Sequence, residues 1–163
     1  MLPPSTLDAA AALLGDLQAR GLTLATAESC TGGLIAAALT AIPGSSATVL
    51  AGYVTYSNDA KARMLGVPAA MLEAHGAVSE PVARAMAEGA RGDAGADLAV
   101  SCTGIAGPGG GSVRKPVGLV FIGCARRGRE GLVERHVFPG DRAEVRAATV
   151  AAAFRLVRRT LSE

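Results

Sequence analysis

Residues 96–104 read ADLAVSCTG, an apolar run that ends in a polar turn. A continuous apolar run of this length is typical of a strand that is buried on both of its faces. Such strands occur in parallel sheets, where crossover helices cover the two faces. The stretch therefore predicts a central strand of an α/β fold.

The segments around this run alternate between strand and helix patterns. Further strands are predicted over residues 22–26, 46–57, 117–126 and 131–140, and helices over residues 3–21, 31–44, 58–67, 68–76, 78–95 and 141–161. Strands separated by helices favour a parallel sheet, and the last two strands favour a hairpin. We expect a single domain over residues 1–163, a three-layer α/β/α sandwich whose sheet is mostly parallel with a late antiparallel hairpin.

The composition predicts an aliphatic core and a cytoplasmic protein. Half of the residues are hydrophobic, but aromatic residues make up only 3% and there is no Trp. Three cysteines form neither an even disulfide set nor a metal-ligand spacing, which fits a reducing compartment and predicts no metal or cofactor. The N-terminus lacks the basic region of a signal peptide, and no apolar run is long enough to cross a membrane, so no membrane partner is expected.

The charge distribution does not favour nucleic-acid binding. The net charge is only +2, and the aromatic side chains on which single strands stack are scarce. The basic residues that gather late in the chain are interpreted as a hairpin edge and the solvated face of the last helix. They are Arg126, Arg127, Arg129, Arg155, Arg158 and Arg159. The Ala-rich helix surfaces and the exposed hairpin predict a homo-oligomer.

Three polar stretches follow the predicted parallel strands. They read ATAESCTGG over residues 25–33, TYSNDAK over residues 55–61 and SCTGIAGPGGG over residues 101–111. In open α/β sheets, ligands bind outside the carboxyl ends of the strands. The topology therefore predicts that these stretches meet in one site.

Ser29 lies between a strand and a glycine-rich helix start, which we place near Thr31. The free N–H groups and the dipole of such a start would stabilise an oxyanion or a phosphate. The hydrolase elbow G-x-S-x-G is not matched, because Ala27 and Thr31 replace its glycines. The alternative is that Glu28, Ser29 or Thr31 is only a helix cap, and this stretch alone leaves both interpretations open.

A serine nucleophile needs a base, and Lys61 is the better candidate. His75 ends a short helix and His136 lies within a strand, so neither is well placed for a triad. A lysine ordinarily titrates at about pH 10.4, but desolvation or a nearby cation such as Arg142 would lower its pKa. The alternative is a solvent-facing helix lysine.

The glycine-rich stretch over residues 103–112 matches no known phosphate-binding pattern. It lacks the lysine of a Walker A motif, and a strand follows it instead of a helix. Ser112 and Lys115 have the S-x-x-K spacing of β-lactamases, but the glycines before them and Pro116 after them make a helix there unfavourable. We interpret the stretch as a loop that lets a ligand approach the backbone closely, with Lys115 as a candidate substrate contact. The alternative is a passive connector.

Several of these stretches together resemble the CinA C-terminal domain family. The resemblance is carried by TAESCTGGLIAAALTAIPGSS (26–46), GYVTYSNDAKARMLGV (52–67), GAVSEPVARAMAEGAR (76–91), TGIAGPGGG (103–111) with KPVGLVFI (115–122), and FPGDRAEVR (138–146). Some members of this family are nicotinamide mononucleotide deamidases. Many relatives carry this domain behind a molybdopterin-binding-like domain, so this chain resembles the stand-alone form.

The resemblance implies hydrolysis of the carboxamide of nicotinamide mononucleotide to nicotinate mononucleotide and ammonia, without a metal. It implies that Ser29 attacks the amide carbon and that neutral Lys61 takes the serine proton. Tyr56 would orient this pair and relay a proton, and Arg142 would bind the phosphate or tune Lys61. The helix-start N–H groups would stabilise the oxyanion. Expected substrate contacts are Cys30, Thr31, Gly32, Gly33, Asn58, Thr103, Gly104, Gly107, Gly109 and Gly110.

The partner expected from the resemblance is a small-molecule nucleotide substrate. One departure from the family pattern is local: Ser112-Val113-Arg114 follows the triple glycine where relatives often have a more polar linker. The family also includes proteins named only for competence or DNA damage. The alternative function is therefore a non-catalytic nucleotide-binding or assembly domain, although such a domain would not need a serine paired with a base.

Overall fold

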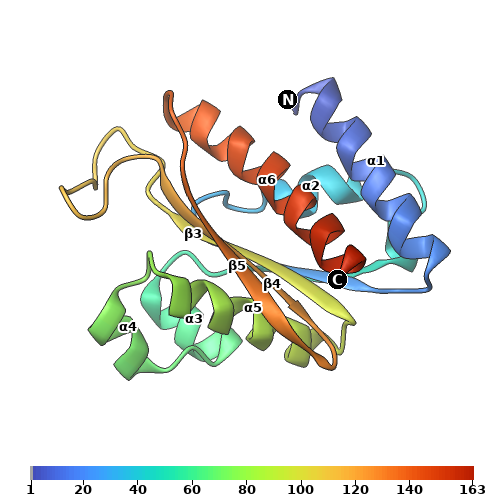
Figure 1. Cartoon of the computed structure of the whole chain (residues 1–163), viewed down its shortest axis with the longest axis horizontal. Coiled ribbons are helices and arrows are strands. Elements are labelled where there is room, and N and C mark those ends of the chain that lie inside the picture. Colours follow the sequence, from blue (N-terminus) through green and yellow to red (C-terminus); the bar gives the residue numbers. More distant parts are fainter. Residues whose placement is uncertain (1) are drawn as a thin grey trace.

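The computed structural model describes residues 2–163, which form one sheet between two layers of helices (Figure 1). The helices are α1 (Pro4–Ala19), α2 (Leu34–Thr40), α3 (Asn58–Leu65), α4 (Ala69–His75), α5 (Glu80–Ala94) and α6 (Arg142–Ser162), with a 3-10 turn at Ser45–Ala47. The strands are β1 (Leu24–Glu28), β2 (Val49–Val54), β3 (Leu98–Gly104), β4 (Leu119–Arg126) and β5 (Arg129–Val137).

The sheet has a parallel half and an antiparallel half. Its strand order is β2-β1-β3-β4-β5. Strand β1 pairs in parallel with β2 and with β3, whereas β4 runs antiparallel to both β3 and β5. Four of the five described strands therefore point the same way, which confirms the predicted α/β fold with a late hairpin.

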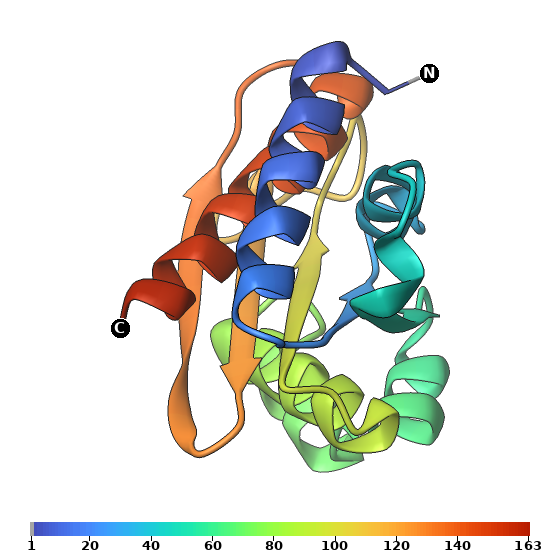
Figure 2. The ribbon, with the colours of Figure 1, turned by 90° about the vertical axis from the view of Figure 1, so that its right-hand side faces the viewer.

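The two layers of helices bury opposite faces of the same central strands. Helices α1, α2 and α6 cover one face, and α3, α4 and α5 cover the other (Figure 1). Figure 2 shows α1 and α6 side by side over the sheet. In β3, Leu98 and Val100 join the core beneath α1, α2 and α6, and Ala99 joins the core beneath α3 and α5. This alternation confirms that β3 is buried on both faces.

The parallel strands bring three chain segments to one edge of the sheet. At the end of β1, Glu28 is paired with Val54 of β2 and with Cys102 of β3. The residues that follow these strands therefore begin beside one another. Helix α3, which follows β2, lies close against α5, because Gly89 of α5 has no Cβ that would overlap the carbonyl oxygen of Leu65.

The late arginines lie where the sequence predicts them, on the hairpin and on the exposed face of α6. Several are paired with carboxylates: Arg158 contacts Asp16 at 2.7 Å and Arg159 contacts Glu134 at 3.0 Å. Among the described residues, no helix combines the length and the apolar character that a membrane span requires.

Candidate active site

The structure brings Ser29 and Lys61 together. Ser29 follows β1 directly, and Lys61 lies one turn into α3. The Lys61 Nζ atom is 3.1 Å from Ser29 Oγ and 2.9 Å from the backbone carbonyl oxygen of Thr55. Ser29 is 7% exposed and Lys61 only 1%. The alternative of a solvent-facing lysine is therefore wrong.

Burial lowers the pKa of the Lys61 ammonium below its ordinary value. Its two hydrogen-bond partners, a hydroxyl and a backbone carbonyl, carry no charge that would hold the ammonium form. A neutral amine can donate to the Thr55 carbonyl and accept the hydrogen of Ser29 Oγ–H. The geometry therefore suits proton transfer from the serine to the lysine.

A hydrogen-bonded turn fixes the position of Ser29. Its backbone N–H donates to the Cys102 carbonyl oxygen of β3 at 3.1 Å, and its own carbonyl accepts from the Gly32 N–H at 3.0 Å. Gly32 and Gly33 have φ angles of 58° and 107°, in the left-handed region that favours glycine. The two glycines thus allow the chain to reverse between Ser29 and α2.

The second helix starts later than the sequence predicts, and the Glu28 side chain explains why. Helix α2 begins at Leu34 and not near Thr31. The buried Glu28 carboxylate accepts hydrogen bonds from the Ile35 N–H at 2.8 Å, the Ala36 N–H at 3.0 Å and the Thr31 hydroxyl at 2.6 Å. The N–H group of Leu34, the first residue of α2, donates to the Thr31 carbonyl oxygen at 3.1 Å. The first three N–H groups of α2 are therefore occupied and do not face a substrate oxyanion, and Glu28 caps two of them.

Other backbone donors lie closer to the serine. In the described part of the chain, the N–H groups of Cys30 and Thr31 donate to no oxygen atom. The contact with the Cys102 thiol, together with burial, raises the pKa of the Cys30 thiol well above its ordinary value. Cys30 therefore stays protonated and is a poor competitor of Ser29 as a nucleophile.

Tyr56 and Arg142 contact each other at the exposed rim of this edge. One guanidinium nitrogen of Arg142 donates to the Tyr56 hydroxyl at 3.0 Å, and another donates to the Gly107 carbonyl oxygen at 2.9 Å. Arg142 starts α6, which Asp141 caps. Hydrogen bonds thus join Arg142 to Tyr56 and to the glycine-rich loop, and not to Lys61, whose pKa is lowered by desolvation.

The glycine-rich loop borders a cavity of about 600 Å³ beside Arg142, lined also by Pro108 and Val117. Gly109 and Gly110 are exposed in this loop. Ser112 accepts from the Lys115 N–H in a loop and not in a helix, and Lys115 Nζ donates to the His75 carbonyl oxygen at 2.7 Å. The S-x-x-K spacing therefore carries no catalytic pair.

Three other residues that were predicted to contact the substrate have a structural role or position in the fold. The Thr103 hydroxyl donates to the Ala77 carbonyl oxygen at 2.8 Å. A Cβ atom at Gly104 would lie 2.8 Å from the carbonyl oxygen of Leu119, so glycine is required for the pairing of β3 with β4. Asn58 is the exposed first residue of α3, whose cap is Ser57.

Two residues near the site were not predicted from the sequence. Arg146 of α6 donates to the Thr31 carbonyl oxygen at 3.0 Å, and Cys102 Sγ lies 3.0 Å from the Thr31 hydroxyl. Both hold the turn that follows Ser29. The only signal in the sequence is that Arg146 lies one helical turn after Arg142, and this does not reveal a contact with a backbone carbonyl.

Comparisons with known proteins identify the family and match the fold. The sequence model of the CinA C-terminal domain family matches residues 7–161 of this chain. A competence/damage inducible protein of Agrobacterium tumefaciens is 47% identical, with a TM-score of 0.95 over 98% of this chain and 97% of that chain. The competence damage-inducible protein A of Klebsiella pneumoniae is 40% identical, with a TM-score of 0.93 over 97% of this chain and 98% of that chain.

The curated relatives are longer than this chain. A CinA-like protein of Citrifermentans bemidjiense is 59% identical over 145 residues, which are 89% of this chain and 35% of that protein. The chain spans about a third of the length of the curated relatives it matches. Residues 7–161 include both Ser29 and Lys61, so the family match covers the whole of the site described above. The chain belongs to the CinA C-terminal domain family.

Proposed function

We propose that this protein hydrolyses the carboxamide of nicotinamide mononucleotide to nicotinate mononucleotide and ammonia. The observation that carries the proposal is the buried contact of 3.1 Å between Lys61 Nζ and Ser29 Oγ. A lysine that is buried without a carboxylate partner is costly to protonate, which is the property that a general base of this kind requires. The identity of the substrate rests on the sequence resemblance.

In the first half of the reaction, Ser29 Oγ attacks the carboxamide carbon and neutral Lys61 takes the hydroxyl proton. The carbonyl oxygen becomes an oxyanion, which the N–H groups of Cys30 and Thr31 stabilise. The Lys61 ammonium then gives its proton to the departing nitrogen. Ammonia leaves, and an ester forms between Ser29 and the nicotinoyl group.

In the second half, water attacks the ester carbon and Lys61 takes the proton of that water. The tetrahedral intermediate collapses, Lys61 returns the proton to Ser29 Oγ, and nicotinate mononucleotide leaves as a carboxylic acid that ionises. One water is consumed for each ammonia released. Lys61 thus acts as a base and then as an acid in each half of the reaction.

Arg142 is the proposed contact for the phosphate of the nucleotide. It lines the cavity of about 600 Å³ beside the glycine-rich loop, and its guanidinium group carries several donors in a planar fork. The Tyr56 hydroxyl, 3.0 Å from Arg142, lies at the same rim. We assign this pair to binding of the nucleotide phosphate at the rim, since Ser29 and Lys61 themselves do not line this cavity.

Ammonia release from nicotinamide mononucleotide by the purified protein tests the proposal. Ser29→Ala and Lys61→Ala are expected to lower the rate about 10³-fold or more. Ser46→Ala and Arg63→Ala, at exposed positions, are the matched controls and should keep the wild-type rate. Activity that survives Ser29→Ala would show that the nucleophile is wrong. Binding of the nucleotide without turnover would support a binding domain instead.

A further inference from the structure

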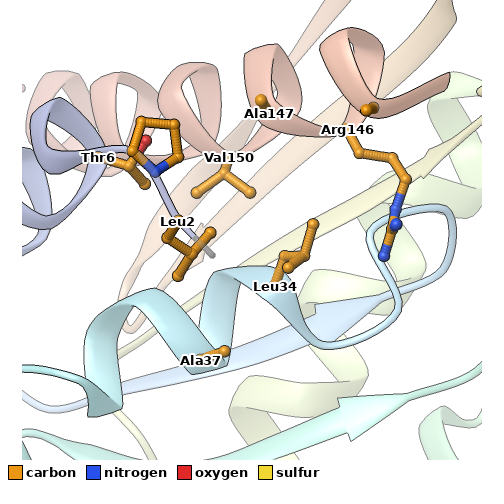
Figure 3. Close-up of a pocket in the computed structure, with 9 residues that line it drawn as sticks. Leu2, Thr6, Leu34, Ala37, Arg146, Ala147 and Val150 are labelled. Atoms are coloured by element: carbon orange, nitrogen blue, oxygen red, sulfur yellow. The ribbon is translucent and has the colours of Figure 1, made fainter. Parts of the chain in front are cut away.

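A second cavity, of about 550 Å³, lies between the start of α1, helix α2 and helix α6 (Figure 3). Seven of its nine lining residues are apolar, among them Leu34 on α2 and Val150 on α6. In Figure 3 these side chains point toward one another from facing helices. None of Ser29, Tyr56 and Lys61 lines this cavity, which adjoins the cavity beside Arg142 at Ala143, and its volume lies in the range of small-molecule sites.

Arg146 is the single charged residue in the lining of this cavity. One of its terminal nitrogens donates to the Thr31 carbonyl oxygen at 3.0 Å. Its Nε atom is buried and has no hydrogen-bond acceptor among the described residues. A buried donor without an acceptor is unfavourable, and a guanidinium that forms no salt bridge with a described carboxylate favours an anion.

We propose that this cavity binds a small carboxylate with an apolar body, whose carboxylate pairs with Arg146. The apolar lining would bury a short hydrocarbon chain, and the guanidinium would supply the counter-charge. The same guanidinium holds the turn after Ser29 through Thr31. A bound carboxylate therefore restrains Arg146 and, through it, the backbone of residues 30–33.

Titration calorimetry with octanoate tests the site without any need for turnover. We expect wild-type protein to bind octanoate with a dissociation constant of about 1 mM or tighter. Neutral 1-octanol should bind about tenfold more weakly, because it cannot pair with the guanidinium. Hydrogen exchange of the amides of residues 30–33 should slow when octanoate is bound.

Two variants test the charge of Arg146 and the space of the cavity separately. Arg146→Gln removes the charge and leaves a neutral amide on a shorter side chain, so octanoate binding should weaken about tenfold. Ala37→Phe places a ring in the cavity from an exposed position of α2 and should abolish binding. Ala12→Phe, at an exposed position of α1 outside the cavity, is the matched control.

Three results would overturn the proposal. They are octanoate binding weaker than about 1 mM, equal affinity for octanoate and octanol, or an affinity that Ala37→Phe leaves unchanged. Displacement of octanoate by nicotinamide mononucleotide would also overturn it, because the cavity would then be part of the substrate site. If Arg146→Gln does not fold, Ala37→Phe and the octanol comparison still decide.

Discussion

The two halves of the sheet differ in how deeply their ionisable side chains are buried. At the carboxyl ends of the parallel strands, Glu28 and Lys61 are both buried, at 0% and 1% exposure. At the β4–β5 hairpin and the end of α6, charged side chains are solvated and paired, as in the contact between Arg159 and Glu134. Burial makes a charge expensive and shifts its chemistry, whereas solvation keeps its energy small. The parallel half therefore holds the candidate active site.

The two buried groups are stabilised in different ways. Three donors, two of them backbone N–H groups in the first turn of α2, contact the Glu28 carboxylate. Lys61 has only a hydroxyl and a backbone carbonyl, so its ammonium form is disfavoured by desolvation. Glu28 is thus suited to hold the turn in place, and Lys61 is suited to exchange protons.

The largest expected effect comes from Lys61→Met, which removes the amine and leaves an unbranched side chain one atom shorter. Ammonia release should fall about 10³-fold or more, because Ser29 loses its base. The free energy of unfolding, measured with urea, should stay the same or rise, because an apolar group replaces a buried amine. A large loss of stability instead would mean that Lys61 is mainly a structural residue.

The pH dependence follows from the same group. Below the lowered pKa of Lys61, the rate should fall about tenfold for each pH unit, as the amine becomes protonated. A rate that stays flat between about pH 5 and 9 would exclude a lysine base. The measurement is the pH profile of kcat/KM, which reports the free enzyme.

Stability should depend on pH in the same direction. Between the lowered pKa and the ordinary value of 10.5, the unfolded chain binds the lysine proton and the folded chain does not. The contribution of Lys61 to the free energy of unfolding should therefore rise with pH across that window, and it is lost as pH falls through the folded pKa. The Cys30 and Cys124 thiols, whose pKa is raised, act in the opposite direction in both proteins. In urea titrations, the stability of the wild type should therefore rise with pH relative to that of Lys61→Met.

A smaller effect is expected from Glu28→Gln. The amide group of glutamine cannot accept at both positions, so at least one of the Ile35 and Ala36 N–H groups, or the Thr31 hydroxyl, loses its acceptor. An unsatisfied buried donor costs about 1–3 kcal/mol of unfolding free energy. Urea unfolding measures this loss, with the exposed Glu73→Gln as the control. A variant as stable as the wild type would contradict the capping role.

The elements of this fold were predictable because their signals are local. The apolar run of β3 marks a strand buried on both faces, and Ser57 and Asp141, residue types that cap helices, do cap α3 and α6. The predicted start of α2, near Thr31, was wrong because the group that caps the helix, the Glu28 carboxylate, binds N–H groups seven and eight positions later in the chain. That contact depends on the turn at Gly32 and Gly33, which a helix pattern does not reveal.

The candidate site likewise has a part that the sequence predicts and a part that it does not. Ser29 and Lys61 follow predicted strands, so topology was enough to bring them to one edge of the sheet. The contacts of Lys61 with the Thr55 carbonyl and of Arg146 with the Thr31 carbonyl involve backbone oxygens. Every residue has a backbone carbonyl oxygen, so these partners cannot be predicted from the residue types in the sequence.

The smallest effect is expected in the antiparallel half, from Arg159→Ala. This side chain is 54% exposed and contacts Glu134 at 3.0 Å and Glu163 at 3.3 Å. Solvated pairs of this kind contribute less than about 1 kcal/mol, and salt screens them. Urea unfolding should show a small loss at low salt that shrinks at about 1 M NaCl, with ammonia release unchanged. Impaired turnover would mean that the hairpin half takes part in catalysis, and the division between the two halves of the sheet would fail.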